Sequence, residues 1–482
     1  MIMNKTYIGK LTIITIVAFT LQSCFVAKNY DRPDLKEIDN LYRTDHIDTD
    51  STSTAALSWK ELFPDPFLSE YIEEGLQNNL DIRIAVQQIA AAESYMKQGK
   101  MGYLPSLDAK ASMTHQELAA NSQFGSFFSG SLEQFELTGN LSWEADIWGK
   151  IRSNQRATQA SYLQSTAAHQ AVKTRLISEI ASNYYLLLAL DKQHKITEET
   201  IENRKKSLQT IQALKEAGNV TQVAVDQTAA QLYNAQALLI DIEKNVFRTE
   251  NVLAILLGKP ATSIDRNSLE NQTVTTDLNI GLPAYLLANR PDVLAAEYKL
   301  VNAFELTNVA KSNFYPSLTI TGSGGFQSLE FKEWFSSGSL FATMVGGITQ
   351  PIFNKRRIRT QYEVAKAQKE ESLLNYKKTL LIAGQEVSNA LYEYEAETRK
   401  YEYRKNEVET LRNAELNSEV LLNNGFGTYL DLLTARQNAL SAELNIIDNK
   451  LQQLQAVVEL YRALGGGWKV KRSFWNLPFP SF

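Results

Sequence analysis

Long stretches of the chain carry apolar residues at helical spacing and contain no proline. Residues 151–217 and 356–424 are the longest of these, and each is followed at once by a glycine, Gly218 or Gly425. A helix of that size is about 100 Å long, and glycine permits a tight reversal at its end. Shorter helical segments follow at 221–257 and 428–464, and segment 67–103 predicts one further helix that ends before Pro105.

The two helices after these glycines have apolar residues spaced alternately by four and three. The seam in 428–464 comprises Leu440, Leu444, Ile447, Leu451, Leu454, Val458 and Tyr461, and the seam in 221–257 comprises Leu232, Ala235, Leu239, Ile242 and Val246. Such spacing predicts coiled-coil packing against a neighbouring helix. The later helix has a second stripe, Leu432, Ala435, Ala439, Ala442 and Ile446. Contacts on two sides favour a closed ring of helices, although a long coiled-coil spacer has the same pattern.

Between the helical segments, apolar and polar residues alternate with a period of two. Strands are expected at about 106–115, 135–147, 317–326 and 339–352, with apolar positions such as Leu107, Ala109, Ala111 and Met113. Strands of about ten residues with one apolar face are typical of a transmembrane β-barrel, whose other face lines a water-filled lumen. A soluble sheet covering a helical layer is the alternative.

The two halves of the chain repeat each other. Asn79-Leu80-Asp81 matches Arg290-Pro291-Asp292 at an offset of 211, and Gly218 and Thr221 match Gly425 and Thr428 at an offset of 207. The fold class predicted is therefore mainly α with a membrane β-barrel section. Its duplicated unit reads helix, strand, strand, long helix, helix, and covers residues 66–258 (repeat 1) and 283–465 (repeat 2).

Four strands cannot close a barrel, and open sheet edges are not tolerated in lipid. Two copies supply eight strands, whose interior side chains fill the barrel, whereas three copies supply twelve and leave a lumen. Three copies also supply twelve helical columns. A trimer is therefore the smallest assembly that forms an open tube.

The start of the chain predicts export from the cytoplasm. Lys5 and Lys10 precede an apolar run at 11–19, and Leu21-Gln22-Ser23 precedes Cys24, which is the only cysteine. This order is that of a secretory signal peptide over residues 1–23. It resembles a bacterial lipobox, which implies cleavage before Cys24 and lipidation of that residue. An ordinary signal peptide with a chance cysteine is the alternative.

Composition excludes several classes of protein. The 482 residues carry a formal net charge of −5, which argues against a nucleic-acid binder. No run of 18 apolar residues offers a membrane-spanning helix. The four histidines lie far apart and match no metal-ligand spacing, and the sequence has no phosphate-binding loop or nucleophile elbow. We therefore expect no catalytic residue, no metal and no cofactor, and the chain is not expected to be an enzyme.

Several motifs in a fixed order are similar to those of a known family, the TolC/OprM-like outer-membrane factors, and within it to the efflux outer-membrane lipoprotein (NodT-type) branch. Besides Cys24 and the two glycines, the motifs are Asn79-Leu80-Asp81, Leu104-Pro105-Ser106-Leu107, Asp146-Ile147-Trp148-Gly149-Lys150, Asn289-Arg290-Pro291-Asp292, Tyr315-Pro316-Ser317, Tyr429-Leu430-Asp431-Leu432-Leu433 and Leu464-Gly465-Gly466-Gly467-Trp468.

This resemblance implies a homotrimer with a twelve-stranded β-barrel on a twelve-column α-helical barrel. It also implies collar segments, for which the candidates are 24–65 at the anchored N-terminus, the equatorial linker 259–282 and the C-terminal stretch 466–482. The implied function is the passive exit duct of a tripartite efflux pump that carries small molecules such as drugs. Its partners would be a periplasmic adaptor, an inner-membrane pump and outer-membrane lipid. The duct would be lipid-anchored in the outer membrane and extend into the periplasm.

The resemblance places a periplasmic tip and gate at the two helix reversals, with Gly218, Thr221, Gly425, Thr428, Tyr429 and Asp431 as the site residues. Three copies of Asp431 would form a ring of carboxylates that attracts cations and raises its own pKa by repulsion. Alternatively, Asp431 is a solvated residue at a helix start. Rival functions are an exit duct of a type I protein secretion system, a lipid-anchored coiled-coil scaffold without a pore, and a periplasmic adaptor.

Overall fold

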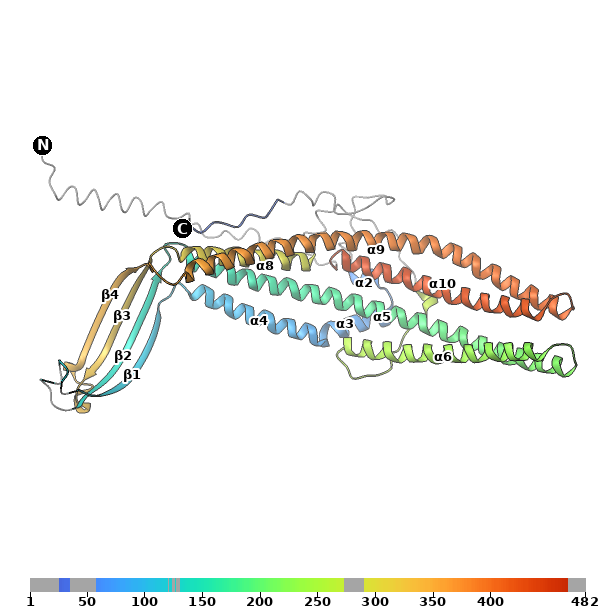
Figure 1. Cartoon of the computed structure of the whole chain (residues 1–482), viewed down its shortest axis with the longest axis horizontal. Helices are drawn as coiled ribbons and strands as arrows, with labels where there is room; N and C mark the ends of the chain where they lie inside the picture. Colours follow the sequence, from blue (N-terminus) through green and yellow to red (C-terminus); the bar gives the residue numbers. More distant parts are fainter. Residues whose placement is uncertain are drawn as a thin grey trace, which may run out of the picture. The chain divides into compact units, whose positions relative to one another are not determined.

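The computed structural model describes residues 26–34, 58–119, 121–123, 126, 131–272 and 290–466. A short helix, α2 (Trp59–Leu62), precedes the first repeat. The first repeat contains α3 (Pro66–Asn78), α4 (Leu80–Met101), β1 (Ser106–Glu117), β2 (Ser131–Ala145), α5 (Lys150–Glu216) and α6 (Gln222–Leu256) (Figure 1). The second contains α8 (Pro291–Ser312), β3 (Ser317–Ser328), β4 (Leu340–Thr349), α9 (Arg357–Asn423) and α10 (Tyr429–Ala463). In the described part of the chain, none of the helices combines the length and the apolar character needed to cross a bilayer.

The order of elements confirms the duplication. In both repeats a helix leads into two strands, a helix of 67 residues and then a helix of 35 residues. The chain divides into two compact units, which are described separately. Of the described residues, the sheet unit comprises those within 26–33, 89–165 and 296–376, and the helical unit comprises residue 34 and those within 58–88, 166–272, 290–295 and 377–466.

The prediction of one helix over 67–103 is wrong, because the chain breaks at Asn79 into α3 and α4. The backbone of Asn79 is extended, with ψ of 133°. Its side-chain oxygen accepts hydrogen bonds from the amides of Asp81 (2.9 Å) and Ile82 (3.2 Å). Asn79 therefore caps a new helix start instead of continuing the old helix.

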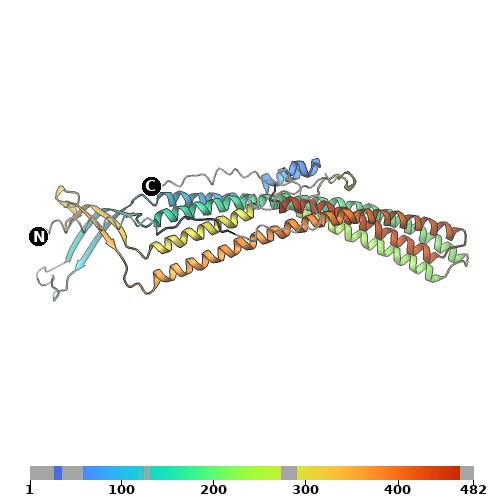
Figure 2. The same cartoon turned by 90° about the horizontal axis from the view of Figure 1, so that it is seen from above.

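The sheet unit holds one antiparallel four-stranded sheet in the order β1-β2-β3-β4, visible in Figures 1 and 2. Its register aligns Leu107, Leu141, Gly322 and Met344 on one face. The adjacent row on the opposite face is Asp108, Asn140, Ser323 and Thr343. The predicted separation into an apolar and a polar face is thus confirmed, and β1 and β4 are edges with one partner each.

The core of the helical unit lies where α5 packs against α10 and the short helices α2 and α3. Tyr184, Leu187 and Leu188 on α5 are fully buried together with Phe63 and Leu68. The predicted seam of α10 joins this core through Ile447, Leu451, Leu454, Val458 and Tyr461. The second stripe of α10 is also buried at Leu432, Ala435, Ala439 and Ala442, so α10 has apolar contacts on two sides, as its pattern predicted.

Candidate functional site

The two helix reversals lie at the same end of the helical unit (Figure 1). Gly218 follows α5 with φ of +78°, and Gly425 follows α9 with φ of +74°. Both positions have open space where a side chain would start, so it is the left-handed backbone that requires glycine there. Thr221 and Thr428 are the cap residues of α6 and α10. We refer to these two reversals as the first and second tips.

The two tips differ in how their second helix begins. At the second tip, the Thr428 hydroxyl accepts from the Asp431 amide at 3.3 Å, and the Asp431 carboxylate accepts from the Thr428 amide at 3.1 Å. The hydroxyl also donates to this carboxylate at 2.6 Å, and this bond is the main reason why the pKa of Asp431 is lowered. At the first tip, Thr221 makes no side-chain cap bond, and Ala224 stands where Asp431 would be.

One hydrogen bond connects the two tips. The Tyr429 hydroxyl at the start of α10 lies 2.6 Å from the Thr228 hydroxyl on α6. Thr228 is buried, with 2% of its surface exposed. The sequence resemblance singled out Tyr429 but not Thr228, because nothing in the sequence around Thr228 marks it as a partner of a residue 201 positions away.

Two arginines bind neighbouring helices together further from the tips. Arg204 on α5 is 6% exposed and donates to the Gln231 carbonyl on α6 and to the Gln437 amide oxygen on α10, the latter at 3.0 Å. Arg436 on α10 lies 3.6 Å from Glu415 and 3.4 Å from Glu419, both on α9. Burial, with the like charge of Arg436, lowers the pKa of Arg204. Sequence reasoning missed both arginines.

The lipidation residue and possible metal sites remain to be placed in the structure. Cys24 lies outside the described residues. Among the residues that are described, no group of three or more His, Cys, Asp or Glu side chains has the geometry to hold a metal ion. The arrangement at the tips and beyond them offers hydrogen-bonded and charged contacts between neighbouring helices.

The family model described as "Outer membrane efflux protein" matches residues 71–259 and 282–466, one match for each repeat. This chain belongs to the outer membrane efflux protein family. It is 29% identical over 428 residues to the "Solvent efflux pump outer membrane protein SrpC" of Pseudomonas putida, covering 88% of the chain and 91% of that relative. It is 25% identical over 411 residues to the "Probable outer membrane lipoprotein SilC" of Salmonella typhimurium, covering 85% of the chain and 88% of that protein.

A solved structure gives the same result for the fold. The chain superposes on the outer-membrane channel OprN with a TM-score of 0.82 and 26% identity, covering 92% of this chain and all of the OprN chain. The predicted family and fold class are therefore confirmed. So is the predicted function, because the family is one of outer-membrane channels in efflux pumps.

Proposed function

We propose that three copies of this chain form the exit duct of a tripartite efflux pump, which passively conducts small molecules such as drugs from the periplasm to the outside. The observation that carries this proposal is the sheet of four strands, which has one apolar face and two unpaired edges. Three sheets joined edge to edge close a ring of twelve strands, in which β4 of one copy lies antiparallel to β1 of the next.

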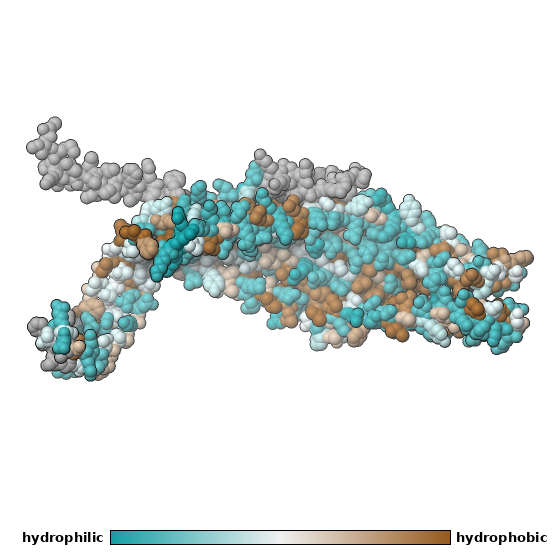
Figure 3. Space-filling model, in the orientation of Figure 1, coloured by the Kyte–Doolittle hydropathy of each residue, from teal (hydrophilic) through white to brown (hydrophobic). Residues whose placement is uncertain are grey.

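The helices give a second argument for assembly. Tyr233, Ile240 and Phe247 on α6 repeat every seven residues and are 65%, 64% and 66% exposed. Figure 3 shows apolar patches on the surface of the helical unit in this view. An apolar seam left exposed at heptad spacing is the pattern of a helix that packs against another helix. In the ring proposed here, that helix belongs to the neighbouring copy.

Transport through such a duct needs energy from elsewhere, so the proposed partners are a periplasmic adaptor and an inner-membrane pump. Relatives are named for the efflux of solvents, toluene and antibiotics. These names favour small-molecule cargo over the secreted proteins of a type I system. The proposal is tested by purifying the full chain in mild detergent, measuring its mass by native mass spectrometry and its conductance in planar bilayers. A trimer that conducts ions is expected, and a stable monomer without conductance would contradict the proposal.

The lipid anchor on Cys24 is part of the same proposal. Residues 26–33 run antiparallel to α8: Arg32 bonds Glu297 (2.7 Å), Asn308 donates to the Lys28 carbonyl (2.9 Å) and Lys311 donates to the Val26 carbonyl (3.3 Å). The end of α8 beside Val26 leads directly into β3. A lipid attached two residues before Val26 would therefore enter the membrane beside the sheet. Metabolic labelling with palmitate tests this, because Cys24→Ser should abolish the label.

We place the gate of the duct at the second tip, with Tyr429 and Asp431 as its residues. The Tyr429–Thr228 bond holds the start of α10 against α6, and a ring of three Asp431 carboxylates would attract cations. In a single copy the pKa of Asp431 is lowered, so its charge is constant between pH 7 and 5. In a closed ring, mutual repulsion would raise the pKa of these carboxylates relative to the single copy.

Conductance in planar bilayers distinguishes the two roles of Asp431. A ring predicts that wild-type cation selectivity decreases as the pH is lowered towards the carboxyl range and that Asp431→Ala abolishes this change. Unchanged conductance and selectivity in Asp431→Ala would leave Asp431 only as the residue that starts α10. Tyr429→Phe and Thr228→Val remove the same hydrogen bond and should raise conductance equally, without adding to each other in the double variant.

A further inference from the structure

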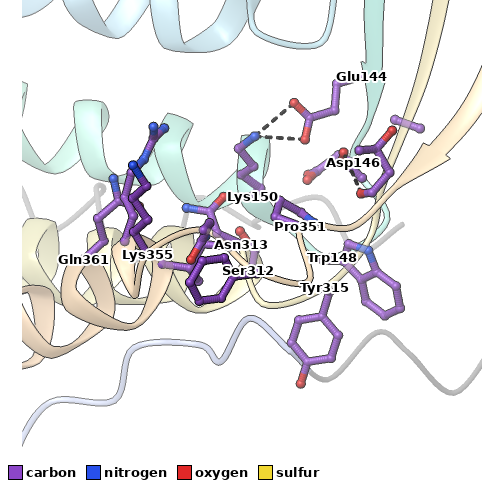
Figure 4. A pocket seen from close by; sticks show the side chains of 17 residues that line it. Glu144, Asp146, Trp148, Lys150, Ser312, Asn313, Tyr315, Pro351, Lys355 and Gln361 are labelled. Atoms are coloured by element: carbon purple, nitrogen blue, oxygen red, sulfur yellow. Dashed lines mark hydrogen bonds and ion pairs between the residues drawn. The ribbon is translucent and has the colours of Figure 1, made fainter.

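A cavity of about 820 Å³ lies in the sheet unit where strands end and helices begin. Ala145, Ser317 and Thr349 contribute the ends of β2, β3 and β4, and residues around Trp148 and Lys355 contribute the connections to α5 and α9. Figure 4 shows Trp148 and Tyr315 side by side, with Lys355 and Gln361 on the opposite side of the cavity. We propose that this cavity binds the phosphoethanolamine headgroup of a phospholipid in the membrane that surrounds the sheet.

Two cations line this cavity without a partner. Lys150 is neutralised by Glu144, with contacts of 2.9 and 3.0 Å. Lys355 and Arg357 line the same space, and neither side chain has a carboxylate or hydrogen-bond partner anywhere in the described part of the chain. Unpaired cations that converge on a concave site are suited to a phosphate oxygen, and arginine and lysine are the side chains that bind phosphate most often.

The chain holds one of these cations, Lys355, in a conformation that most residues avoid. Lys355 and Arg356 both have positive φ, 54° and 64°. The position equivalent to Arg356 in the first repeat is Gly149, with φ of 75°. Glycine adopts this backbone without strain, so the second repeat keeps a strain at this corner that the first repeat avoids. Arg356 itself bonds Glu363 and does not line the cavity, whereas the equally strained Lys355 does. Strain maintained at one point of a fold is a sign that the residues there are required for function.

The opposite wall of the cavity suits the amine of the headgroup. Trp148 and Tyr315 are stacked, with ring centroids 4.9 Å apart and planes inclined by 27°. The Trp148 ring is held by its indole nitrogen, which donates to the Pro316 carbonyl at 2.6 Å. Aromatic faces attract an ammonium group. The Asp146 carboxylate, which accepts from the amides of Ile151 and Arg152 at 2.9 Å each, adds negative charge to this side of the cavity. A zwitterionic headgroup therefore meets opposite charge on both sides of the cavity.

The surroundings also suit the acyl chains. Ile352 and Phe353, between β4 and the strained corner, are 99% and 87% exposed. Ile348 continues the apolar face of β4 and is 73% exposed. Basic and aromatic side chains gather where an apolar membrane surface meets water, so the cavity lies at the level of the headgroups. This inference depends on the membrane placement of the sheet but not on transport through the duct.

The test is titration of the full chain, in mild detergent, with short-chain phosphatidylethanolamine, followed by native mass spectrometry. We expect one bound lipid per copy. Lys355→Gln with Arg357→Gln should weaken binding by about tenfold or more, the effect of losing one charge-assisted hydrogen bond. Lys355→Gly removes a cation and also relieves the strain, so it should bind weakly while unfolding at an equal or higher temperature. Lys332→Gln, in the loop at the other end of β3 and β4, is the matched control that should bind normally.

Three outcomes would overturn the proposal. The first is binding by the double variant that equals that of the wild type. The second is equal binding of dioctanoylglycerol, which lacks the phosphate and would reduce the site to an apolar contact. The third is equally tight binding of inorganic phosphate alone, which would make it a site for a free anion. Normal conductance of the double variant in planar bilayers separates this inference from the proposed channel function, which does not require the cavity.

Discussion

The two long helical hairpins come from the same duplicated unit, yet their helices are held together differently. α5 and α6 meet through apolar side chains, among them Ile201, Leu232 and Ala235. α9 and α10 share an apolar cluster at the end far from the tips, which includes Val387, Leu391 and Leu460. Between that cluster and the second tip they are joined by polar contacts, for example Arg412 with Glu443 and Gln453 with Thr398 (3.2 Å). Water and salt ions compete with the partners of an exposed ion pair, whereas they do not replace an apolar contact. Duplication has therefore preserved the backbone while giving one hairpin an apolar interface towards its tip and the other a polar interface there, which can rearrange.

The largest change in stability is expected at two equivalent residues of the repeats, Asn79 and Arg290. Asn79 donates to the Leu256 carbonyl and Arg290 to the Ala463 carbonyl, both at 2.9 Å, so equivalent residues hold equivalent helix ends. Arg290 is 4% exposed and also pairs with Glu386. Arg290→Ala removes the bonds to Asp292, to Glu386 and to the Ala463 carbonyl, and should lower the free energy of unfolding by about 3 kcal/mol. Asn79→Ala loses neutral hydrogen bonds and should cost about 1–2 kcal/mol.

Urea unfolding of the detergent-solubilised protein, followed by circular dichroism, measures both values. Arg462→Ala is the control, because it removes the more exposed partner of Glu386 and leaves Arg290 in place. If Asn79→Ala lowers the free energy of unfolding as much as Arg290→Ala, the charge of Arg290 adds no stability beyond that of a neutral hydrogen bond.

A middle-sized effect is expected from loosening each hairpin. Leu232 is 7% exposed, so Leu232→Ala should destabilise the α5–α6 hairpin by about 2–3 kcal/mol at any salt concentration. Arg412 is 44% exposed, so Arg412→Ala should cost the α9–α10 hairpin no more than about 1 kcal/mol. That cost should shrink in 1 M salt, where the screening length is about 3 Å.

Hydrogen exchange of amides in α6 and α10 at low and high salt follows the two hairpins separately. In the wild type, only exchange in α10 should speed up with salt. Exchange that rises equally in both hairpins would remove the distinction between an apolar and a polar interface.

The smallest effect is expected at the helix starts. Thr428→Ala breaks the reciprocal cap with Asp431 and should weaken the first turn of α10 by about 1 kcal/mol. Thr221→Ala should leave α6 unchanged, because Thr221 makes no such bond. The pKa of Asp431 is lowered in the folded chain, so the cap is present at neutral pH and is lost as pH falls below the usual carboxyl range of about 4. Exchange rates of first-turn amides at pH 7 and at acid pH check both the size and the direction of this effect.

Much of the fold could be predicted because it depends on periodic patterns. The seam at Ile447, Leu451 and Leu454 and the alternation at Leu107 and Ala109 show which side of an element is apolar. They do not show which residue lies opposite. The break at Asn79 was missed because the helical pattern continues on both sides of its local cap on Asp81 and Ile82. Thr228 and Arg204 were missed for a different reason, since an isolated polar residue in a helix gives no sign of its distant partner.

The unpaired edges of the sheet have a consequence for genetics. Each chain has two complementary edge strands, β1 and β4, and in the proposed ring both must pair with a neighbouring copy. A chain altered along β4 still offers an intact β1, so it would join normal chains and leave the ring unsealed. In a cell that makes both forms, most rings would contain at least one defective member. Alleles with damage on one edge strand should therefore act dominantly, whereas alleles that prevent the chain from folding should be recessive.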